Sequence, residues 1–392
     1  MVSERMRGLG TARSVIRELF EYGRLRAAEV GPENVFDFSI GNPSVPAPAA
    51  VNETALRLLA ERPDIHQYTS AQGAPDARER FAASLNRRFG AGCTPDRLYL
   101  TAGAAASLCC VFNGLTCPGD EFIVFAPYFP EYKVFIEGAG ARMVLIPPEI
   151  ESFQIDFDAF EKALSEHTKG VLINSPNNPS GTVYSRATLE RLAGVLVQKS
   201  QEYGHPIYLI SDEPYREIVY AGVEAPWVPH IYRDTIVCYS FSKSLSLPGE
   251  RLGYVLVPKE AAEGDDVYAA VAGAGRSLGY VCAPSLFQQI TSLCCDMTSD
   301  LKIYEENAKF FVSALREMGF HVVEPGGAFY LFPRTLEADD VAFCSRAKEL
   351  DLLIVPGSGF GAPGHTRISY CVQPDTIRRS LPKFKALADS YQ

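Results

Sequence analysis

Residues 236–253 read IVCYSFSKSLSLPGERLG. The segment begins with an apolar run at 236–239, which is typical of a buried strand. A loop rich in hydroxyl side chains follows, and it contains one lysine, Lys243, and one arginine, Arg251. A second apolar run begins at Gly253. The pattern predicts that a lysine and an arginine lie together in a loop at the end of a buried strand.

Short apolar runs of this kind recur through the middle of the chain. They are bounded by Gly, Pro, Asn or Asp and lie at 98–101, 122–125, 142–146, 171–174, 207–211, 236–239 and 253–257. Helix-length segments separate several of them, at 104–115, 158–166 and 186–203. This alternation predicts an α/β fold in which helices cover both faces of a mainly parallel sheet. Ligands bind beyond the carboxyl ends of the strands in such sheets, so polar residues there are the candidates for chemistry.

The pattern changes after about residue 285. A helix is expected at 300–318, strands at 320–323, 328–332, 352–355 and 366–370, and further helices between and after them. An amphipathic helix is expected at 14–28, before a Pro-rich connector at 41–48. We therefore predict a large domain at 45–284 and a smaller α+β domain formed by 1–44 and 285–392.

Composition narrows the class of protein. The 392 residues have a formal net charge of −10 at pH 7, which disfavours a nucleic-acid or anionic-membrane surface as partner. No run approaches the length of a membrane span, and the first 19 residues have no apolar core of a signal peptide. The ten cysteines show no zinc-ligand spacing. We expect a cytoplasmic protein without a metal site.

Lys243 and its neighbours suggest one kind of chemistry. An enclosed lysine can lose its proton and form a Schiff base with an aldehyde, and hydroxyl groups with an arginine can hold a phosphate. A second phosphate-type feature is TAGAAASL at 101–108, where a strand ends and a helix of small residues begins. The alternatives are a surface lysine in a loop and close helix–sheet packing.

Two more segments place polar groups after predicted strands. In ISDEPY at 210–215, Asp212 can pair with a protonated ring nitrogen and Tyr215 can donate to a phenolic oxygen. In NSPNNPSG at 174–181, an amide can bind a ligand oxygen. Read alone, the first segment is also compatible with an acidic helix cap and the second with a simple turn.

The order of these four segments, each after a predicted strand, resembles the fold-type-I enzymes of the class I/II aminotransferase superfamily, which depend on pyridoxal 5′-phosphate (PLP). The resemblance covers essentially the whole chain and is greatest to bacterial aspartate-type aminotransferases. It implies the PLP-dependent transferase fold of type I, with a mainly parallel seven-stranded sheet in the large domain.

The resemblance also implies roles for individual residues. Lys243 would form the internal aldimine with PLP and then act as proton shuttle. Asp212 would pair with the pyridinium nitrogen. Tyr215 and Asn178 would bond the phenolic oxygen, and Tyr128, in PYFPEY at 127–132, would stack on the ring. The phosphate would be held by Ser240, Arg251 and the amides of Ala104 and Ala105. Gly103 and Ser242 would also bind the cofactor.

Further roles concern the substrate and a second subunit. Arg367, in TRIS at 366–369, matches the arginine that clamps the substrate α-carboxylate, and Gly41 and Asn178 would line the same pocket. Tyr68 matches the residue that reaches the partner subunit's phosphate, which implies a homodimer with shared active sites. Arg276 is a candidate for the side-chain carboxylate across that interface, or else an ordinary interface or surface residue.

We therefore expect transamination between an L-amino acid, with aspartate favoured, and a 2-oxo acid such as 2-oxoglutarate. Alanine or aromatic donors remain alternatives. A PLP-dependent C–S β-lyase would use the same lysine, and a PLP-binding regulatory module without turnover is the alternative from another class.

Overall fold

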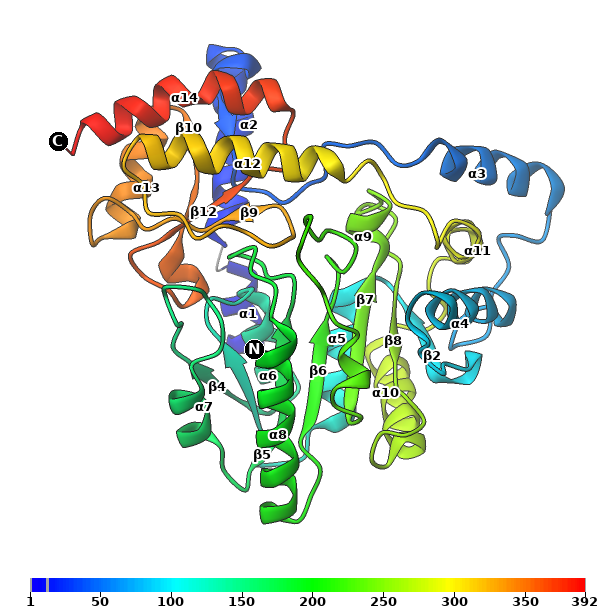
Figure 1. The fold of residues 1–392 in the computed structure, drawn as a ribbon. Helices are drawn as coiled ribbons and strands as arrows, with labels where there is room; N and C mark the ends of the chain where they lie inside the picture. The colour runs from blue at the N-terminus through cyan, green and yellow to red at the C-terminus, as the bar shows by residue number, and fades with distance from the viewer. Residues whose placement is uncertain (1, 12–13, 392) are drawn as a thin grey trace.

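The computed structural model describes residues 2–11 and 14–391. Its centre is a seven-stranded sheet in which one strand, β8, runs antiparallel to its neighbours (Figure 1). In sheet order the strands are β2 (Leu98–Thr101), β8 (Gly253–Leu256), β7 (Thr235–Ser240), β6 (Tyr208–Asp212), β5 (Thr168–Asn174), β3 (Glu121–Phe125) and β4 (Arg142–Ile146). The predicted mainly parallel seven-stranded sheet is confirmed.

The strands read as continuous apolar runs because both faces of the sheet are covered. Phe122 and Val124 of β3 face one core, whereas Ile123 and Phe125 face the other. The first core includes α5 (Ala104–Leu115), α6 (Glu131–Gly138) and α10 (Gly264–Leu278). The second includes α7 (Phe157–Ala163) and α8 (Arg186–Tyr203).

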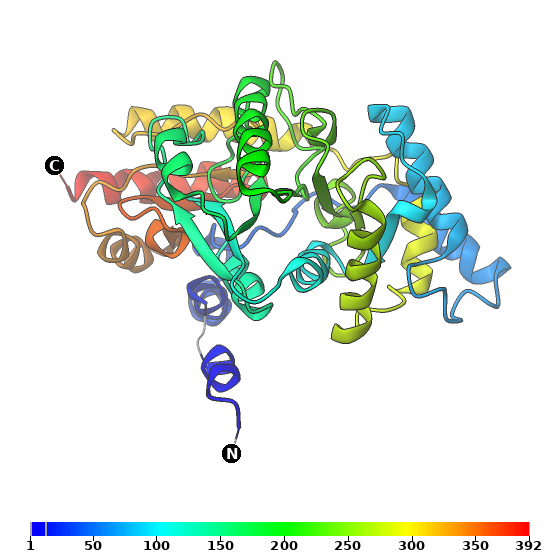
Figure 2. The ribbon, with the colours of Figure 1, turned by 90° about the horizontal axis from the view of Figure 1, so that it is seen from below.

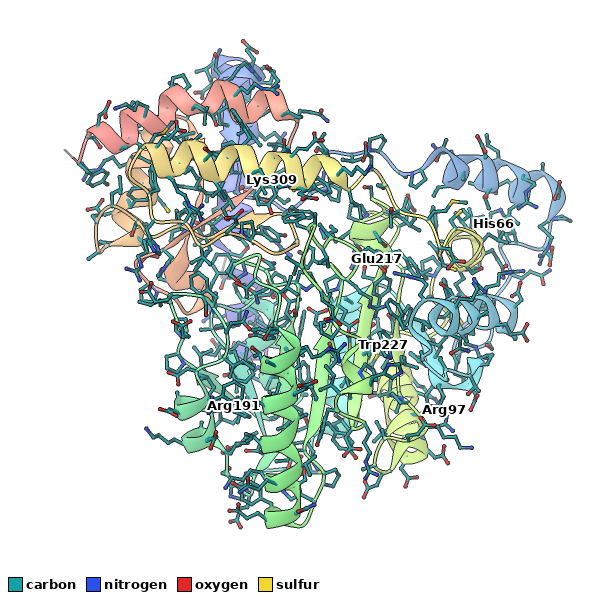
Figure 3. The ribbon with its side chains drawn as sticks, in the orientation of Figure 1. His66, Arg97, Arg191, Glu217, Trp227 and Lys309 are labelled. Carbon is teal, nitrogen blue, oxygen red and sulfur yellow. The ribbon has the colours of Figure 1, made fainter. Side chains whose placement is uncertain are left out.

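Three helices pack together beside the β2 edge of the sheet, on the right of Figure 1. They are α3 (Ala49–Glu61), α4 (Pro75–Phe89) and α11 (Ser285–Leu293). Trp227, labelled in Figure 3, belongs to the same core, and its ring stacks on Phe89 with centroids 4.7 Å apart. Because α11 packs against α3 and α4, we propose that the large domain extends beyond residue 284 to include it.

The smaller α+β region lies above the carboxyl ends of the central strands (Figure 1). Its helices are α2 (Val15–Val30), α12 (Lys302–Glu317), α13 (Asp340–Glu349) and α14 (Pro374–Asp389). A three-stranded antiparallel sheet has the order β11 (Val355–Pro356), β12 (Thr366–Ser369) and β9 (Tyr330–Leu331). The short strand β1 (Phe36–Asp37) pairs in parallel with β10 (Leu352–Leu353), which joins the N-terminal segment to the C-terminal part of the chain.

Two strand predictions in this region were wrong. Residues 320–323 form no strand, and Phe320 and Val322 are apolar because they pack into the core of the smaller region. The run at 352–355 is divided between β10 and β11, which belong to different sheets. Both errors have one cause, because an apolar run of four residues indicates burial without specifying the hydrogen-bond partner.

The remaining elements are short. They comprise α1 (Glu4–Thr11), α9 (Phe241–Ser244) and four 3₁₀ turns at Pro32–Asn34, Pro95–Arg97, Val228–His230 and Gly357–Phe360. Helix α1 has no buried residue and projects from the body beside the N-terminus (Figure 2). No helix in residues 2–11 and 14–391 combines the length and the apolarity that a membrane span requires.

Candidate active site

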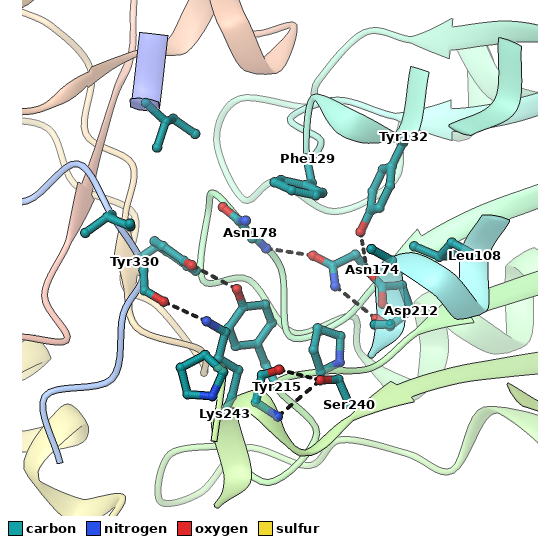
Figure 4. A pocket seen from close by; sticks show the side chains of 18 of the residues that line it. Leu108, Phe129, Tyr132, Asn174, Asn178, Asp212, Tyr215, Ser240, Lys243 and Tyr330 are labelled. Carbon is teal, nitrogen blue, oxygen red and sulfur yellow. Dashed lines mark hydrogen bonds between the residues drawn. The ribbon is translucent and has the colours of Figure 1, made fainter. Parts of the chain in front are cut away.

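A cavity lies at the carboxyl ends of three neighbouring strands. Asn174, Asp212 and Ser240 are the last residues of β5, β6 and β7, and all three line it. The cavity has a volume of about 290 Å³, and Figure 4 shows it from close by. Strands that end at the same edge of a parallel sheet thus bring together polar residues that are far apart in sequence.

Lys243 enters the cavity from the short helix α9. The helix begins directly after β7, and the Ser240 hydroxyl caps it by accepting a hydrogen bond from the Ser242 N–H. Lys243 Nζ donates to the Gly41 carbonyl oxygen at 2.6 Å. Burial lowers the pKa of Lys243 to about 8, because a charged ammonium group is disfavoured away from water. Near neutral pH, part of this lysine is therefore in the nucleophilic amine form.

Asp212 has one satisfied and one unsatisfied carboxylate oxygen. Oδ2 accepts a hydrogen bond from Tyr132 Oη at 2.5 Å, whereas Oδ1 is buried without a partner in the described structure (Figure 4). Burial raises the pKa of Asp212 to about 7, and the Tyr132 hydrogen bond opposes this rise. A buried acceptor without a donor is costly, so Oδ1 is suited to a donor supplied by a ligand.

Tyr215 and Asn178 lie between the strand ends and the smaller region. Tyr215 Oη shares a 2.8 Å hydrogen bond with Tyr330 Oη. The Asn178 N–H donates to Asn174 Oδ1 at 2.8 Å, which fixes the turn that presents the Asn178 amide. Gly41 is required beside them, because a Cβ at this position would lie 2.1 Å from Tyr330 Oη.

Arg367 is 2% exposed and belongs to β12 of the smaller region. Its Nη1 donates to Asn178 Oδ1 at 3.1 Å, its Nη2 donates to the Ser39 carbonyl, and its Nε has no partner. The guanidinium lies over the rings of Tyr330 and Phe360, 5.0 and 4.9 Å from their centroids. Burial lowers its pKa. Within residues 2–11 and 14–391, no carboxylate is among its hydrogen-bond partners.

An anion cradle lies at the N-terminus of α5. Gly103 precedes the helix with φ of 87°, and no side chain caps the free N–H groups. Ala104 and Ala105 line the cavity there with Arg251, whose Nη2 lies so close that a Cβ on Gly103 would approach it to 2.6 Å. Free N–H groups, the helix dipole and a guanidinium favour a phosphate at this point.

Most residues singled out from the sequence line this cavity: Gly41, Ala104, Ala105, Asn178, Asp212, Tyr215, Ser240, Ser242, Lys243, Arg251 and Arg367. Gly103 adjoins them as the cap of α5. Tyr128 is not among the lining residues, and its N–H donates to the Phe360 carbonyl; Phe129 lines the cavity instead. Tyr68 is 97% exposed, and Arg276 is exposed on α10.

Several lining residues were missed in the sequence. Tyr132 and Phe129 belong to the same PYFPEY segment as Tyr128, and Asn174 ends a predicted strand, so the signal for these three was present. Tyr330 follows a Gly-Gly pair in PGGAFY at 325–330, but only its long-range contact with Tyr215 identifies it.

Comparisons with known proteins assign the family. The model of the family "Aminotransferase class I and II" matches residues 33–384. An aspartate aminotransferase of Thermotoga maritima is 32% identical over 362 residues, which cover 91% of this chain and 92% of that protein. The crystal structure of an amino transferase from Eubacterium rectale is 55% identical, covers 100% of this chain and 99% of its own, and superposes with a TM-score of 0.98. An aspartate aminotransferase from Thermus thermophilus with maleate is 27% identical, with a TM-score of 0.85 and coverage of 99% and 100%.

The chain therefore belongs to the class I and II aminotransferases, a family of PLP-dependent transferases. The residues of the cavity fit this cofactor. Asp212 Oδ1 has no donor in the part of the chain that the structure describes, and a protonated ring nitrogen would supply one. The free N–H groups of α5 suit the phosphate, and Lys243 lines the same cavity as an amine of lowered pKa.

Proposed function

We propose that this protein transfers an amino group between an L-amino acid and a 2-oxo acid, and that Lys243 is the residue that binds PLP covalently. The observation that supports this most directly is one cavity with three complementary groups. They are the amine of Lys243, Asp212 Oδ1, which has no hydrogen-bond partner among the described residues, and the buried guanidinium of Arg367, which has no carboxylate partner among them. They suit, respectively, an aldehyde, a ring nitrogen and a substrate carboxylate.

PLP, when bound, supplies an electron sink that stabilises negative charge on the substrate Cα. Asp212 keeps the ring nitrogen protonated through Oδ1, while Tyr132 holds Oδ2 in place. Arg367 and Asn178 bind the α-carboxylate and orient the Cα–H bond toward Lys243. Lys243 Nζ would accept the proton from the substrate Cα and later release it again, a task of general acid–base catalysis that suits an amine whose pKa is about 8.

The aromatic residue that we propose for the cofactor differs from the one expected from the sequence. We propose Phe129 as the side chain that stacks on the cofactor, because Phe129 lines the cavity and Tyr128 does not.

We also propose a homodimer in which Tyr68 reaches a second copy of the chain. A tyrosine that is 97% exposed has almost no contact within its own chain. Aspartate as donor, 2-oxoglutarate as acceptor and a cytoplasmic location stay predictions.

The covalent role of Lys243 is tested with Lys243→Ala and the exposed control Lys259→Ala. Loss of a positioned proton-transfer group costs roughly 10²–10⁴-fold in rate, and loss of the covalent bond adds to this. We expect Lys243→Ala to lack measurable transamination and Lys259→Ala to match the wild type. After borohydride reduction of the holoenzyme, mass spectrometry should find the cofactor on the peptide that contains Lys243.

Turnover of Lys243→Ala near the wild-type rate would overturn the proposal. A second outcome would distinguish a C–S β-lyase from an aminotransferase. If wild-type protein releases ammonia and pyruvate from a cysteine-type substrate without any 2-oxo acid, and no amino acid yields the aminated cofactor, the protein is a lyase.

A further inference from the structure

The segment that follows β1 contacts both Lys243 and Arg367 through its backbone. The Ser39 carbonyl accepts a hydrogen bond from Arg367 Nη2, and the Gly41 carbonyl accepts one from Lys243 Nζ at 2.6 Å. Both carbonyls belong to a stretch of three residues, 39–41. The path of this short segment therefore helps to set where the guanidinium and the amine lie relative to each other.

A carboxylate at the end of β1 holds this segment. Asp37 Oδ1 accepts hydrogen bonds from the Ser39 N–H at 2.8 Å and from Ser39 Oγ at 2.6 Å. An aspartate side chain that bonds the backbone two residues further on fixes a local turn. Ser39 is fully buried, so the loss of Asp37 Oδ1 would leave two buried donors without their acceptor.

The preceding residue, Phe38, is held by strands of the smaller region. Its N–H donates to the Leu353 carbonyl, and its carbonyl accepts from the Ser369 N–H, each at 2.9 Å. Ser369 belongs to β12, the same strand as Arg367. Backbone hydrogen bonds thus fix the segment up to Phe38, and the carboxylate fixes the residue after it.

Asp37 lies near Arg367 but acts on it through Ser39. Burial raises the pKa of Asp37, and the hydrogen bonds from Ser39 and the charge of Arg367 oppose this rise. Helix α2 packs over the carboxylate, since a Cβ on Gly23 would lie 3.4 Å from Asp37 Oδ2. In the described part of the chain, the carboxylate is not among the hydrogen-bond partners of the guanidinium, whereas the Ser39 carbonyl is.

We propose that Asp37 is a positioning residue for the substrate carboxylate. Its Oδ1 fixes Ser39, and the Ser39 carbonyl holds the Arg367 guanidinium in the orientation that receives the substrate. The inference rests on the proposed function, in which Arg367 binds the α-carboxylate, and it adds the residue that orients this arginine. Displacement of a positioning group by about 1 Å can cost about 10²-fold in rate, so the effect should be measurable.

The test compares two reagents that differ by one carboxylate, aminooxyacetate and methoxyamine. Each forms an oxime with the carbonyl carbon of PLP in the holoenzyme and releases the amine of Lys243, which visible absorbance follows. The ratio of their second-order rate constants, aminooxyacetate over methoxyamine, is the carboxylate preference. We expect Asp37→Ala to lower this preference about tenfold and to leave the methoxyamine rate unchanged.

Two further variants separate the position of the carboxylate from its charge, and they keep the test valid if Asp37→Ala fails to fold. Asp37→Asn keeps an acceptor at Oδ1 without the charge, so we expect it to retain the carboxylate preference. Asp37→Glu keeps the charge but displaces the acceptor by one methylene group, so we expect it to lower the preference. The reverse order would show that charge and not position matters, and it would overturn the inference.

Arg26→Ala is the matched control for a loss of stability in the same region. Arg26 Nε pairs with Asp351 Oδ1 at 2.8 Å, which joins α2 to the residue before β10, and neither partner lines the cavity. We expect Arg26→Ala to keep the wild-type preference, while urea unfolding reports the stability of each variant. Equal losses with the two reagents in Asp37→Ala would show a merely structural role and would overturn the inference.

Arg367→Leu separates a failure of this inference from a failure of the proposed function. If Arg367→Leu abolishes the carboxylate preference and Asp37→Ala keeps it, Arg367 binds the carboxylate and only the role of Asp37 is wrong. If the wild type shows no preference, Arg367 does not bind the carboxylate, and both assignments fail. If the protein binds no PLP, the proposed function itself fails.

Discussion

Arg216 and Arg367 are both buried arginines near the ends of the central strands, but their surroundings differ. Arg216 Nε donates to the Glu213 carboxylate at 2.5 Å, and Nη1 donates to Tyr254 Oη at 3.1 Å. Its guanidinium also lies 4.5–5.4 Å from the ring centroids of Phe89, Trp227 and Tyr239. This network raises the pKa of Arg216 well above its ordinary value, although burial opposes the rise.

Arg367 has neither a carboxylate partner nor a raised pKa among the described residues. Asp37 acts on the pKa of Arg367 less than Tyr330 and Tyr215 do, and Asp37 Oδ1 accepts its hydrogen bonds from Ser39 instead. A buried ion pair is strongly destabilised when one partner is removed, whereas a buried cation without a carboxylate partner is suited to bind an external anion. The comparison therefore separates structural charge from functional charge without reference to the family.

The largest effect on stability is expected when the ion pair between Arg216 and Glu213 is broken. Arg216→Met leaves the Glu213 carboxylate buried without a counter-ion, which costs about 3–5 kcal/mol in the free energy of unfolding. Urea unfolding of the apoprotein measures this. The control is Arg191→Met. Arg191, labelled in Figure 3, has a side chain that is 56% exposed and lies over the ring of Phe157, so its loss should change stability by less than about 1 kcal/mol. If the double variant Glu213→Leu/Arg216→Met is no more stable than Arg216→Met alone, the unpaired Glu213 carboxylate is not the cause of the lost stability.

Lys243 extends the comparison to a second unpaired cation. Burial lowers its pKa to about 8 from 10.5, so the native apoprotein binds this proton more weakly than the unfolded chain. Protonated Lys243 therefore destabilises the apoprotein below pH 8, and the penalty is relieved as pH rises from about 8 to 10.5. We expect Lys243→Met to gain up to about 3 kcal/mol at pH 7 and almost nothing at pH 10.5. Denaturant titrations across this range measure the difference, and a pH-independent gain would contradict the assignment.

Substitution of Arg367 should reduce activity and leave stability intact, which is the opposite of the effect expected at Arg216. Arg367→Leu removes charge-assisted hydrogen bonds to the substrate, so the single-turnover efficiency with a reactive donor should fall about 100-fold, which corresponds to about 2.7 kcal/mol. The unfolding free energy of the apoprotein should stay unchanged or rise, because an unpaired buried charge is removed. Arg367→Lys keeps the charge and should retain part of the efficiency. A large loss of stability in Arg367→Leu would erase the distinction between the two arginines.

The smallest effect is expected at Tyr132, a neutral side chain that donates a hydrogen bond to the buried carboxylate of Asp212. Tyr132→Phe deletes the hydrogen bond to Asp212 Oδ2 and should weaken PLP binding about tenfold, since a hydrogen bond to a charged group contributes roughly 1.5–3 kcal/mol. The phenol lowers the pKa of Asp212, so its loss raises that pKa further above about 7. The defect should therefore be greater at pH 6.5 than at pH 8.5 in a fluorescence titration of the apoprotein. Tyr128→Phe, outside the cavity, is the matched control.

The sequence predicts the sheet and its polar strand ends well, because a strand covered on both faces must be apolar throughout. The sequence singled out Lys243, Asp212 and Asn178 because each follows such a run, and all three line the cavity. The smaller region was harder to predict, since its strands are only two to four residues long and burial alone explains an apolar run such as 320–323.

Contacts between segments that are distant in sequence could not be predicted from local sequence patterns. Tyr128 and Phe129 are adjacent aromatics in a loop, and which of them faces the cavity depends on the path of the backbone after β3. The hydrogen bond of Tyr215 with Tyr330 joins residues 115 positions apart. The unpartnered state of Asp212 Oδ1 is likewise a property of the packed site, and no sequence pattern encodes it.

The cavity wall joins Ile16 from near the start of the chain to Arg367 from near its end, and β1 pairs with β10. Translation delivers these segments in order, so β1 leaves the ribosome long before the strand that it pairs with. Asp212 and Lys243 are also synthesised before Arg367, the arginine that we propose clamps the substrate. Any nonsense mutation upstream of codon 367 therefore deletes that clamp, even where the codons for the lysine and the central sheet are intact.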